Sequence, residues 1–211
     1  MSREPWNRQK PPEYHTASEY EKVLWACGIP SRFWNTKLSS IHTASTNYSF
    51  KDHKVEHAKA TDQMQYLTER INNPELLDAN RLACFTSIPT DEHAMAAACL
   101  MAASYISQDY MALRPVHVRV DDIQDYEKCK STGKEFYPTK PDVVILYNLN
   151  DNSSRERLSL ASDLLKTDFE GAYRAVVATS DSPLKFAKEK LFLEPQEVYH
   201  FEGKPRKVHS R

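Results

Sequence analysis

Residues 82–100 constrain the fold of this chain more than any other stretch. They begin with a short apolar run, pass through a compact turn that contains Pro89, and end in an alanine-rich segment. This order predicts a β-strand, a loop and an α-helix. A second apolar run, residues 141–149, contains four consecutive aliphatic side chains, which is typical of a strand buried on both faces of a parallel sheet. The two runs predict an α/β domain of three layers, with a parallel central sheet flanked by helices.

Other segments supply the remaining helices and strands of such a domain. A helix is predicted at residues 18–27 with Ser18 as its N-terminal cap, because an acceptor side chain there is followed by acidic residues in the first turn. A strand at residues 114–120 should lead into a helix that Asp121 caps. The sequence pattern further predicts helices at residues 63–71 and 151–166 and a strand at residues 172–181.

Strand, loop and helix are also the order of a phosphate-binding P-loop, G-x-x-x-x-G-K-[ST]. Its two glycines, its lysine and its hydroxyl residue are replaced here by Ser87, Glu92, His93 and Ala94, with Thr90 inside the turn. Each lost charge-assisted hydrogen bond to a phosphate costs about 1.5–3 kcal/mol, so two or three losses weaken binding about a thousandfold or more. We interpret the stretch as a P-loop whose nucleotide site has been lost, and expect no cofactor. An unrelated strand–turn–helix is the alternative.

A second segment carries a resemblance to a known family. Ile29, Pro30, Arg32, Phe33 and Leu38 match an I-P-x-R-[FY] element that ends in an apolar residue. This element resembles the segment just ahead of the ATPase core in bacterial replicative-helicase loaders and their IstB-type transposition relatives, which are AAA+ ATPases. The resemblance implies an AAA+-like P-loop NTPase fold over residues 18–207.

The resemblance also implies what the other site strands should carry. In that family the Walker B strand ends in two acidic residues that hold Mg²⁺, whereas Tyr147 and Asn148 stand there in this chain. A phenol and an amide are poor substitutes for two carboxylates on a hard cation. The family's sensor strand ends in Thr-Ser-Asn, and here it reads Thr179, Ser180 and Asp181. The segment after it holds lysines where the family has an arginine finger, and lysine lacks the planar fork of arginine.

These losses imply an inactive P-loop ATPase homologue rather than an enzyme. The function that the resemblance implies is an ATP-independent DNA-replication accessory protein, of a phage or mobile element, that binds a replicative helicase or another replisome component. One alternative is a pseudo-ATPase scaffold or regulatory subunit in a transposition or phage assembly. Another is an enzyme that uses His93, Glu92 and Tyr147 for acid–base chemistry.

The two ends of the chain are expected to serve recognition. Residues 1–17 are predicted to form a flexible arm, and residues 208–211 a basic tail. Aromatic and apolar side chains of the arm and the first helix are the candidate partner contacts: Trp6, Tyr14, Tyr20 and Leu24. An alternative is that Trp6 and Tyr14 anchor the arm on its own domain. The candidate nucleic-acid contacts, expected to bind single-stranded DNA weakly, are Lys204, Arg206 and Lys207.

The composition of the chain argues against several classes of ligand. The formal net charge of −1 over 211 residues creates no global field that attracts nucleic acid or membrane. The four cysteines are widely spaced and form no C-x-x-C pair, which argues against a zinc ribbon. His53 and His57 lie four residues apart but lack further ligands at a recognisable spacing, so no metal site is predicted. With no apolar signal core and no membrane-length run, the protein is expected to be cytoplasmic.

Overall fold

The computed structural model describes residues 10, 12–41, 47–51, 54–58, 60–73, 80–109, 116–132 and 140–202. Its centre is a five-stranded sheet in which every neighbouring pair of strands is parallel. The strand order is β4-β5-β6-β3-β7, so β3 lies inside the sheet between β6 and β7. The strands are β3 (Leu82–Ile88), β4 (Val118–Asp122), β5 (Val143–Asn150), β6 (Tyr173–Thr179) and β7 (Glu197–Glu202).

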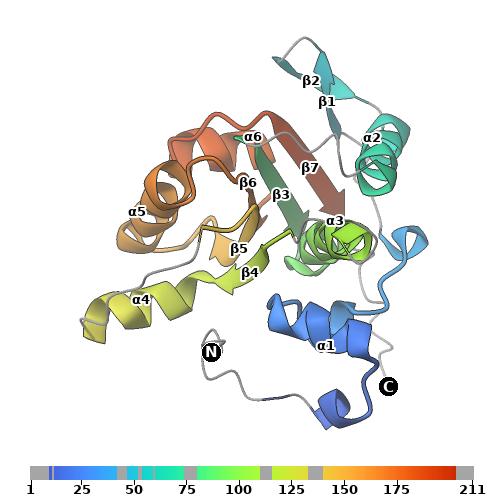
Figure 1. The fold of residues 1–211 in the computed structure, drawn as a ribbon. Coiled ribbons are helices and arrows are strands. Elements are labelled where there is room, and N and C mark those ends of the chain that lie inside the picture. The colour runs from blue at the N-terminus through green and yellow to red at the C-terminus, as the bar shows by residue number, and fades with distance from the viewer. Residues whose placement is uncertain are drawn as a thin grey trace, which may run out of the picture.

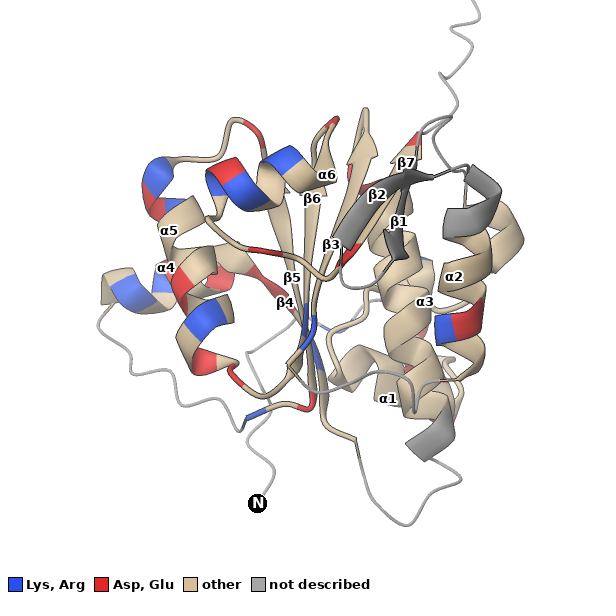
Figure 2. Cartoon of the chain, turned by 90° about the horizontal axis from the view of Figure 1, so that it is seen from above, with Lys and Arg blue, Asp and Glu red and all other residues tan. Residues whose placement is uncertain are grey.

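Helices cover both faces of this sheet, which gives the three layers seen edge-on in Figure 2. One layer holds α1 (Glu19–Ala26), α2 (Ala60–Asn72) and α3 (Glu92–Asp109). The other holds α4 (Ile123–Thr132), α5 (Arg155–Asp163) and α6 (Pro183–Lys185). Two π-helical turns, η5 (Leu164–Asp168) and η6 (Phe186–Lys190), continue α5 and α6. A hairpin of β1 (Asn47–Lys51) and β2 (Lys54–Ala58) lies near α2 and β7 (Figure 1).

Three short 3-10 turns complete the N-terminal part: η1 (Pro12–His15), η2 (Ser31–Phe33) and η3 (Leu38–Ser40). The predicted α/β class and the predicted strand–turn–helix are confirmed by β3 and α3. Ser18 caps α1, and its side chain and that of Glu21 form a reciprocal capping box. Ser154 caps α5 by accepting a hydrogen bond from the Arg157 N–H.

The alanine-rich composition of α3 follows from its place between the sheet and the helices α1 and α2. Figure 1 shows α3 between the sheet on one side and α1 and α2 on the other. Ala94, Ala97 and Ala102 are fully buried, and the Tyr20 hydroxyl on α1 donates a hydrogen bond to the Ala103 carbonyl at 3.1 Å. Small side chains let backbones approach closely on both sides, and a helix that is apolar all round is typical of a buried one.

One predicted boundary is wrong, at the start of β4 and α4. The strand begins at Val118 rather than at residue 114, and Asp121 lies inside it instead of capping the helix. The buried Asp121 carboxylate pairs with Arg119 at 2.8 Å and accepts a hydrogen bond from the Tyr126 hydroxyl at 2.7 Å. Asp122 takes the capping role, accepting from the Gln124 N–H at 2.8 Å. Because the Asp121 carboxylate is paired with the buried Arg119 guanidinium, the strand continues through Asp121.

Both edges of the central sheet are covered. At the β4 edge, the Val120 N–H donates a hydrogen bond to the carbonyl of Cys27, which directly follows α1. At the β7 edge, the residues from Glu197 to Phe201 are all buried. Covered edges are one way in which native proteins avoid unwanted strand pairing.

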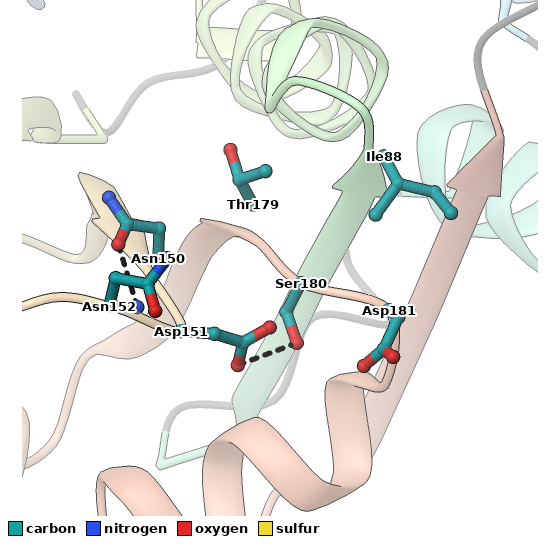
Figure 3. Close-up of a pocket in the computed structure, with 7 residues that line it drawn as sticks. All are labelled: Ile88, Asn150, Asp151, Asn152, Thr179, Ser180 and Asp181. Carbon is teal, nitrogen blue, oxygen red and sulfur yellow. Dashed lines mark hydrogen bonds between the residues drawn. The ribbon is translucent and has the colours of Figure 1, made fainter.

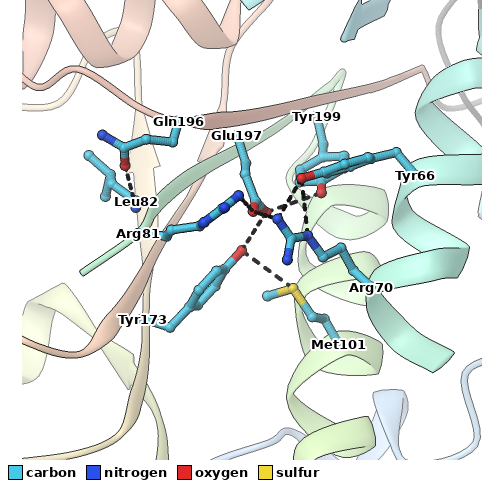
Figure 4. Close-up of polar contacts among 9 residues, drawn as sticks. All are labelled: Tyr66, Arg70, Arg81, Leu82, Met101, Tyr173, Gln196, Glu197 and Tyr199. Atoms are coloured by element: carbon cyan, nitrogen blue, oxygen red, sulfur yellow. Dashed lines mark hydrogen bonds and ion pairs between the residues drawn. The ribbon is translucent and has the colours of Figure 1, made fainter. Parts of the chain in front are cut away.

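A buried ionic cluster joins the amino-terminal ends of three strands to α2 (Figure 4). The Glu197 carboxylate at the start of β7 has no exposed surface and lies 2.8 Å from the Arg70 guanidinium and 3.4 Å from that of Arg81. The hydroxyls of Tyr173 and Tyr199 donate to its other oxygen at 2.8 and 3.2 Å. Burying a carboxylate is costly unless its oxygens are paired in this way.

We expect Glu197→Ala to lower the free energy of unfolding by about 3–5 kcal/mol, because it leaves the buried Arg70 without its counter-charge. Urea unfolding followed by circular dichroism measures this loss. Glu19→Ala is the control, since it breaks a solvent-exposed pair with Lys22 and should leave the midpoint almost unchanged. Equal midpoints for the two variants would contradict a stabilising role for the cluster.

Candidate functional site at the carboxyl edge of the sheet

The turn between β3 and α3 is closed by its own side chains. The buried Ser87 hydroxyl donates to the Thr90 carbonyl at 2.5 Å and accepts from the Ala94 N–H at 3.2 Å. The Thr90 hydroxyl lies 3.4 Å from the Glu92 N–H as its acceptor. In a P-loop, backbone N–H groups at the start of the helix bind phosphate oxygens. Here two of the corresponding N–H groups are already satisfied by hydroxyl oxygens of the chain.

The carboxyl end of β5 carries a structural amide rather than a metal ligand. Asn148 has a φ of +70°, a left-handed conformation that asparagine tolerates better than most residues. The β5–β6 pairing shifts register around it, and its side-chain amide donates to both carboxylate oxygens of Asp122 at 3.1 and 3.2 Å. Since Asp122 also caps α4, Asn148 fastens the end of β5 to the end of β4. Tyr147 is half-buried and packs against the core on the α3 face.

The turn also carries a carboxylate, that of Asp91, whose negative charge would repel an anion. Asp91 is half-buried, and burial raises the pKa of its carboxyl, an effect that the neighbouring Arg32 guanidinium partly opposes. Glu92 and Asp122 add further negative charge beside it and raise the same pKa. The Glu92 side chain is exposed, whereas that of His93 is half-buried.

A cavity of about 640 Å³ opens at the carboxyl ends of β3, β5 and β6 (Figure 3). The crossover after β3 leads to one face of the sheet and the helices after β6 lie on the other, so the cavity marks a topological switch point. Ligands of open α/β sheets bind at such points. The side chains that line it are polar apart from one isoleucine: Ile88, Asn150, Asp151, Asn152, Thr179, Ser180 and Asp181.

The cavity is lined by hydrogen-bonded polar groups and carries negative charge. The buried Ser180 hydroxyl donates to the Asp151 carboxylate at 3.1 Å, and the Asn152 N–H donates to the Asn150 side chain at 2.9 Å. Asp151 and Asp181 are exposed, and none of the seven lining residues in the described part of the chain is basic. The cavity therefore presents negative charge, which disfavours an anionic ligand.

Sequence reasoning missed a buried polar pair next to this edge. The Thr86 hydroxyl on β3 and Nδ1 of His200 on β7 are hydrogen-bonded at 2.9 Å, and the two residues face each other in the parallel register. Burial lowers the pKa of His200, while the nearby Glu202 and Asp181 carboxylates act in the opposite direction. Thr86 has no exposed surface, so the pair is closed to a substrate and has a structural role.

The partner-contact residues of the N-terminal part face inward where they are described. Leu24 is fully buried and Tyr20 is half-buried against the same core, so neither offers a free apolar surface. The Tyr14 ring contacts the Trp25 ring on α1 edge-to-face at 4.9 Å, which docks η1 on its own domain. Residues predicted to contact a partner or nucleic acid that lie outside the described part of the chain are Trp6, Lys204, Arg206 and Lys207.

Among the described residues, no three or more histidine, cysteine, aspartate or glutamate side chains gather where a metal ion could be held. His57 lies in β2 and His53 lies outside the described residues. No helix in the described ranges is both long and apolar enough to span a bilayer.

No protein-family model matches the chain, and no curated protein sequence matches it.

We expect stability to fall as the pH is lowered from about 6.5, the ordinary pKa of histidine, through the lowered pKa of His200. In that pH range the imidazole of His200 binds a proton in the unfolded state but stays neutral in the folded state, which favours unfolding. Urea midpoints of the wild type and His200→Gln between pH 8 and pH 5 measure the effect, and the variant should give the flatter profile. Parallel profiles would show that His200 is not the titrating group.

Proposed function

We propose that this protein is an ATP-independent DNA-replication accessory protein with a degenerate AAA+-like P-loop fold, which acts by binding a replicative helicase or another replisome component. The observation that carries the proposal is the turn between β3 and α3. Two of its helix-start N–H groups, those of Glu92 and Ala94, are bound to the hydroxyls of Thr90 and Ser87, so side chains of the protein take the place of phosphate oxygens there. A fold that keeps this turn without its anion site is left with surface recognition.

The arrangement of the strands supports the P-loop reading. A P-loop, a sensor strand and a Walker B strand can act on one phosphate only if their carboxyl ends meet. The strands in the corresponding places are β3, β6 and β5, and they are consecutive in the sheet. The residues expected at the sensor position, Thr179 and Ser180, line the same cavity as Ile88 at the end of β3.

The N-terminal element that resembles the loader family is built into the same domain. Ile29 and Phe33 are buried in the core that also holds α3. Arg32 is exposed between them and lies close enough to Asp91 to lower the pKa of its carboxyl, against the effect of burial. The element thus packs beside the start of α3, in keeping with its position ahead of the ATPase core in the loader family.

Electrostatics supports the loss of ATP. A nucleotide triphosphate and its Mg²⁺ need donors and a balanced set of charges, whereas Asp91, Asp151 and Asp181 bring negative charge to this edge. Repulsion adds to the bonds already lost with the glycines and lysine. Binding to a partner protein without nucleotide is the function that remains compatible with this edge.

Calorimetric titration with ATP and Mg²⁺ should give no binding heat at millimolar nucleotide, because two helix-start donors of the turn are already bound to hydroxyls of the chain and the turn has no lysine. A parallel thermal melt should show the same midpoint with and without ATP. Micromolar affinity or an ATP-dependent rise in the midpoint would overturn the proposed loss of the site.

The protein should bind a purified replicative helicase from the organism that carries it, with the same affinity in the presence and absence of ATP. Surface plasmon resonance with the immobilised helicase measures this, and a helicase with an unrelated sequence serves as the control surface. Recovery of transposition or packaging proteins instead, with no helicase binding, would favour the scaffold alternative.

A further inference from the structure

Phe192 combines two unusual properties. Its side chain is 74% exposed, and no other large apolar residue in the described ranges is exposed. Its backbone has a φ of +52°, in the left-handed region that bulky residues avoid because of steric repulsion. An exposed apolar residue alone is ordinary, but one held in an unfavourable conformation has to be maintained by its surroundings.

Those surroundings fix the segment on both sides. Leu191 and Leu193 are both buried in the core on the α5 and α6 face of the sheet. The Ser162 hydroxyl of α5 donates to the Leu191 carbonyl at 2.7 Å, and the Leu193 N–H donates to the Ala187 carbonyl at 2.9 Å. The two leucines point into the core, and the residue between them is turned outward.

The helical turn before Phe192 also helps to hold its ring outward. The π-helical turn η6 ends with the Leu191 N–H donating to the Phe186 carbonyl at 3.3 Å. Lys188 and Glu194 form an ion pair at 2.7 Å that joins η6 to the residues after Phe192. π-helical turns are rare and frequently occur at functional sites. The aromatic ring is therefore presented on a rigid turn, which reduces the conformational entropy lost on binding.

The charges around Phe192 favour a protein over a nucleic acid. Along the chain the ring is flanked by Lys188, Glu189, Lys190 and Glu194, so the two signs balance. Figure 2 shows positive and negative residues interspersed over α5 and α6 in the same layer. Binding of single strands requires a positive groove along the backbone. An aromatic anchor inside a mixed-charge rim is instead typical of a protein–protein contact.

A second copy of this chain is a poor receptor for the ring. The carboxyl-edge cavity is lined almost entirely by polar side chains, and a smaller cavity of about 310 Å³ beside η1 and η2 is mainly polar as well. Neither of these two cavities offers an apolar counterpart to the ring. We therefore take a different protein with an apolar pocket as the receptor.

We propose that Phe192 is the anchor through which this protein docks into an apolar pocket of its partner. The identity of that partner as a replicative helicase rests on the proposed function. The surface concerned is the turn from Lys188 to Glu194, at the amino-terminal end of β7 and on the opposite edge of the sheet from the cavity.

The test uses Phe192→Gly and Phe192→Asn, which accept a left-handed backbone and remove the ring. Both variants should bind the helicase at least about thirtyfold more weakly, the loss expected of an interface hot spot. Their melting midpoints should lie within about 2 °C of the wild type or above it, because the strained conformation is relieved. Phe192→Tyr should bind within about threefold of the wild type. Glu189→Ala, a rim substitution, is the matched control and should do the same.

The outcomes separate this proposal from the proposed function. If the wild type binds helicase and the glycine and asparagine variants bind equally well, the anchor is refuted and the proposed function stands. If the wild type does not bind, both are refuted. A large fall in the melting midpoint would assign Phe192 to the core and overturn the proposal. Loss of self-association in sedimentation runs, or of binding to an oligo(dT) probe, would overturn it in favour of a second copy or a nucleic acid.

Discussion

The Glu197 carboxylate is the constraint on which the arrangement of the strands depends. It starts β7, its partners come from α2, from the residue before β3 and from β6, and all of these lie at the amino-terminal edge. Parallel pairing places Glu197 opposite Ala83. A shift of one residue would turn the carboxylate to the other face of the sheet, away from both arginines. The buried charge thus specifies a register, which apolar strands of similar sequence define less strictly.

At the opposite, carboxyl-terminal edge, internal hydrogen bonds close the ends of the loops. The hydroxyls of Ser87 and Thr90 bind the N–H groups that begin α3, and Asn148 binds the cap of α4. Each of these hydrogen bonds satisfies a donor or acceptor that would otherwise be left unpaired. The turn and the bulge therefore satisfy these donors and acceptors within the chain itself.

The sequence predicted the architecture well because its strands are continuous apolar runs and its helices are capped by recognisable residues. β5 and the capping box at Ser18 are examples. The predicted cap at Asp121 was wrong because pairing with Arg119 and Tyr126 depends on tertiary contacts that local patterns do not contain. Leu24 was proposed as a contact although its periodicity equally fits a core position, and it is buried. The conformation of Phe192 had no sequence signal, since left-handed residues are usually glycine or asparagine. The sequence carried only a weak signal for the cavity, because polar residues after a strand are common.

The covered edges of the central sheet limit the ways in which this protein can assemble with others. Many recognition domains bind an extended peptide as an additional strand, using the free N–H and carbonyl groups of an edge. Here Cys27 occupies part of the β4 edge, and β7 is buried from Glu197 to Phe201. A partner therefore finds no open strand to extend in the central sheet, and specificity at this sheet has to come from side chains, whose shape and charge can change by single substitutions without disturbing the hydrogen bonds of the sheet.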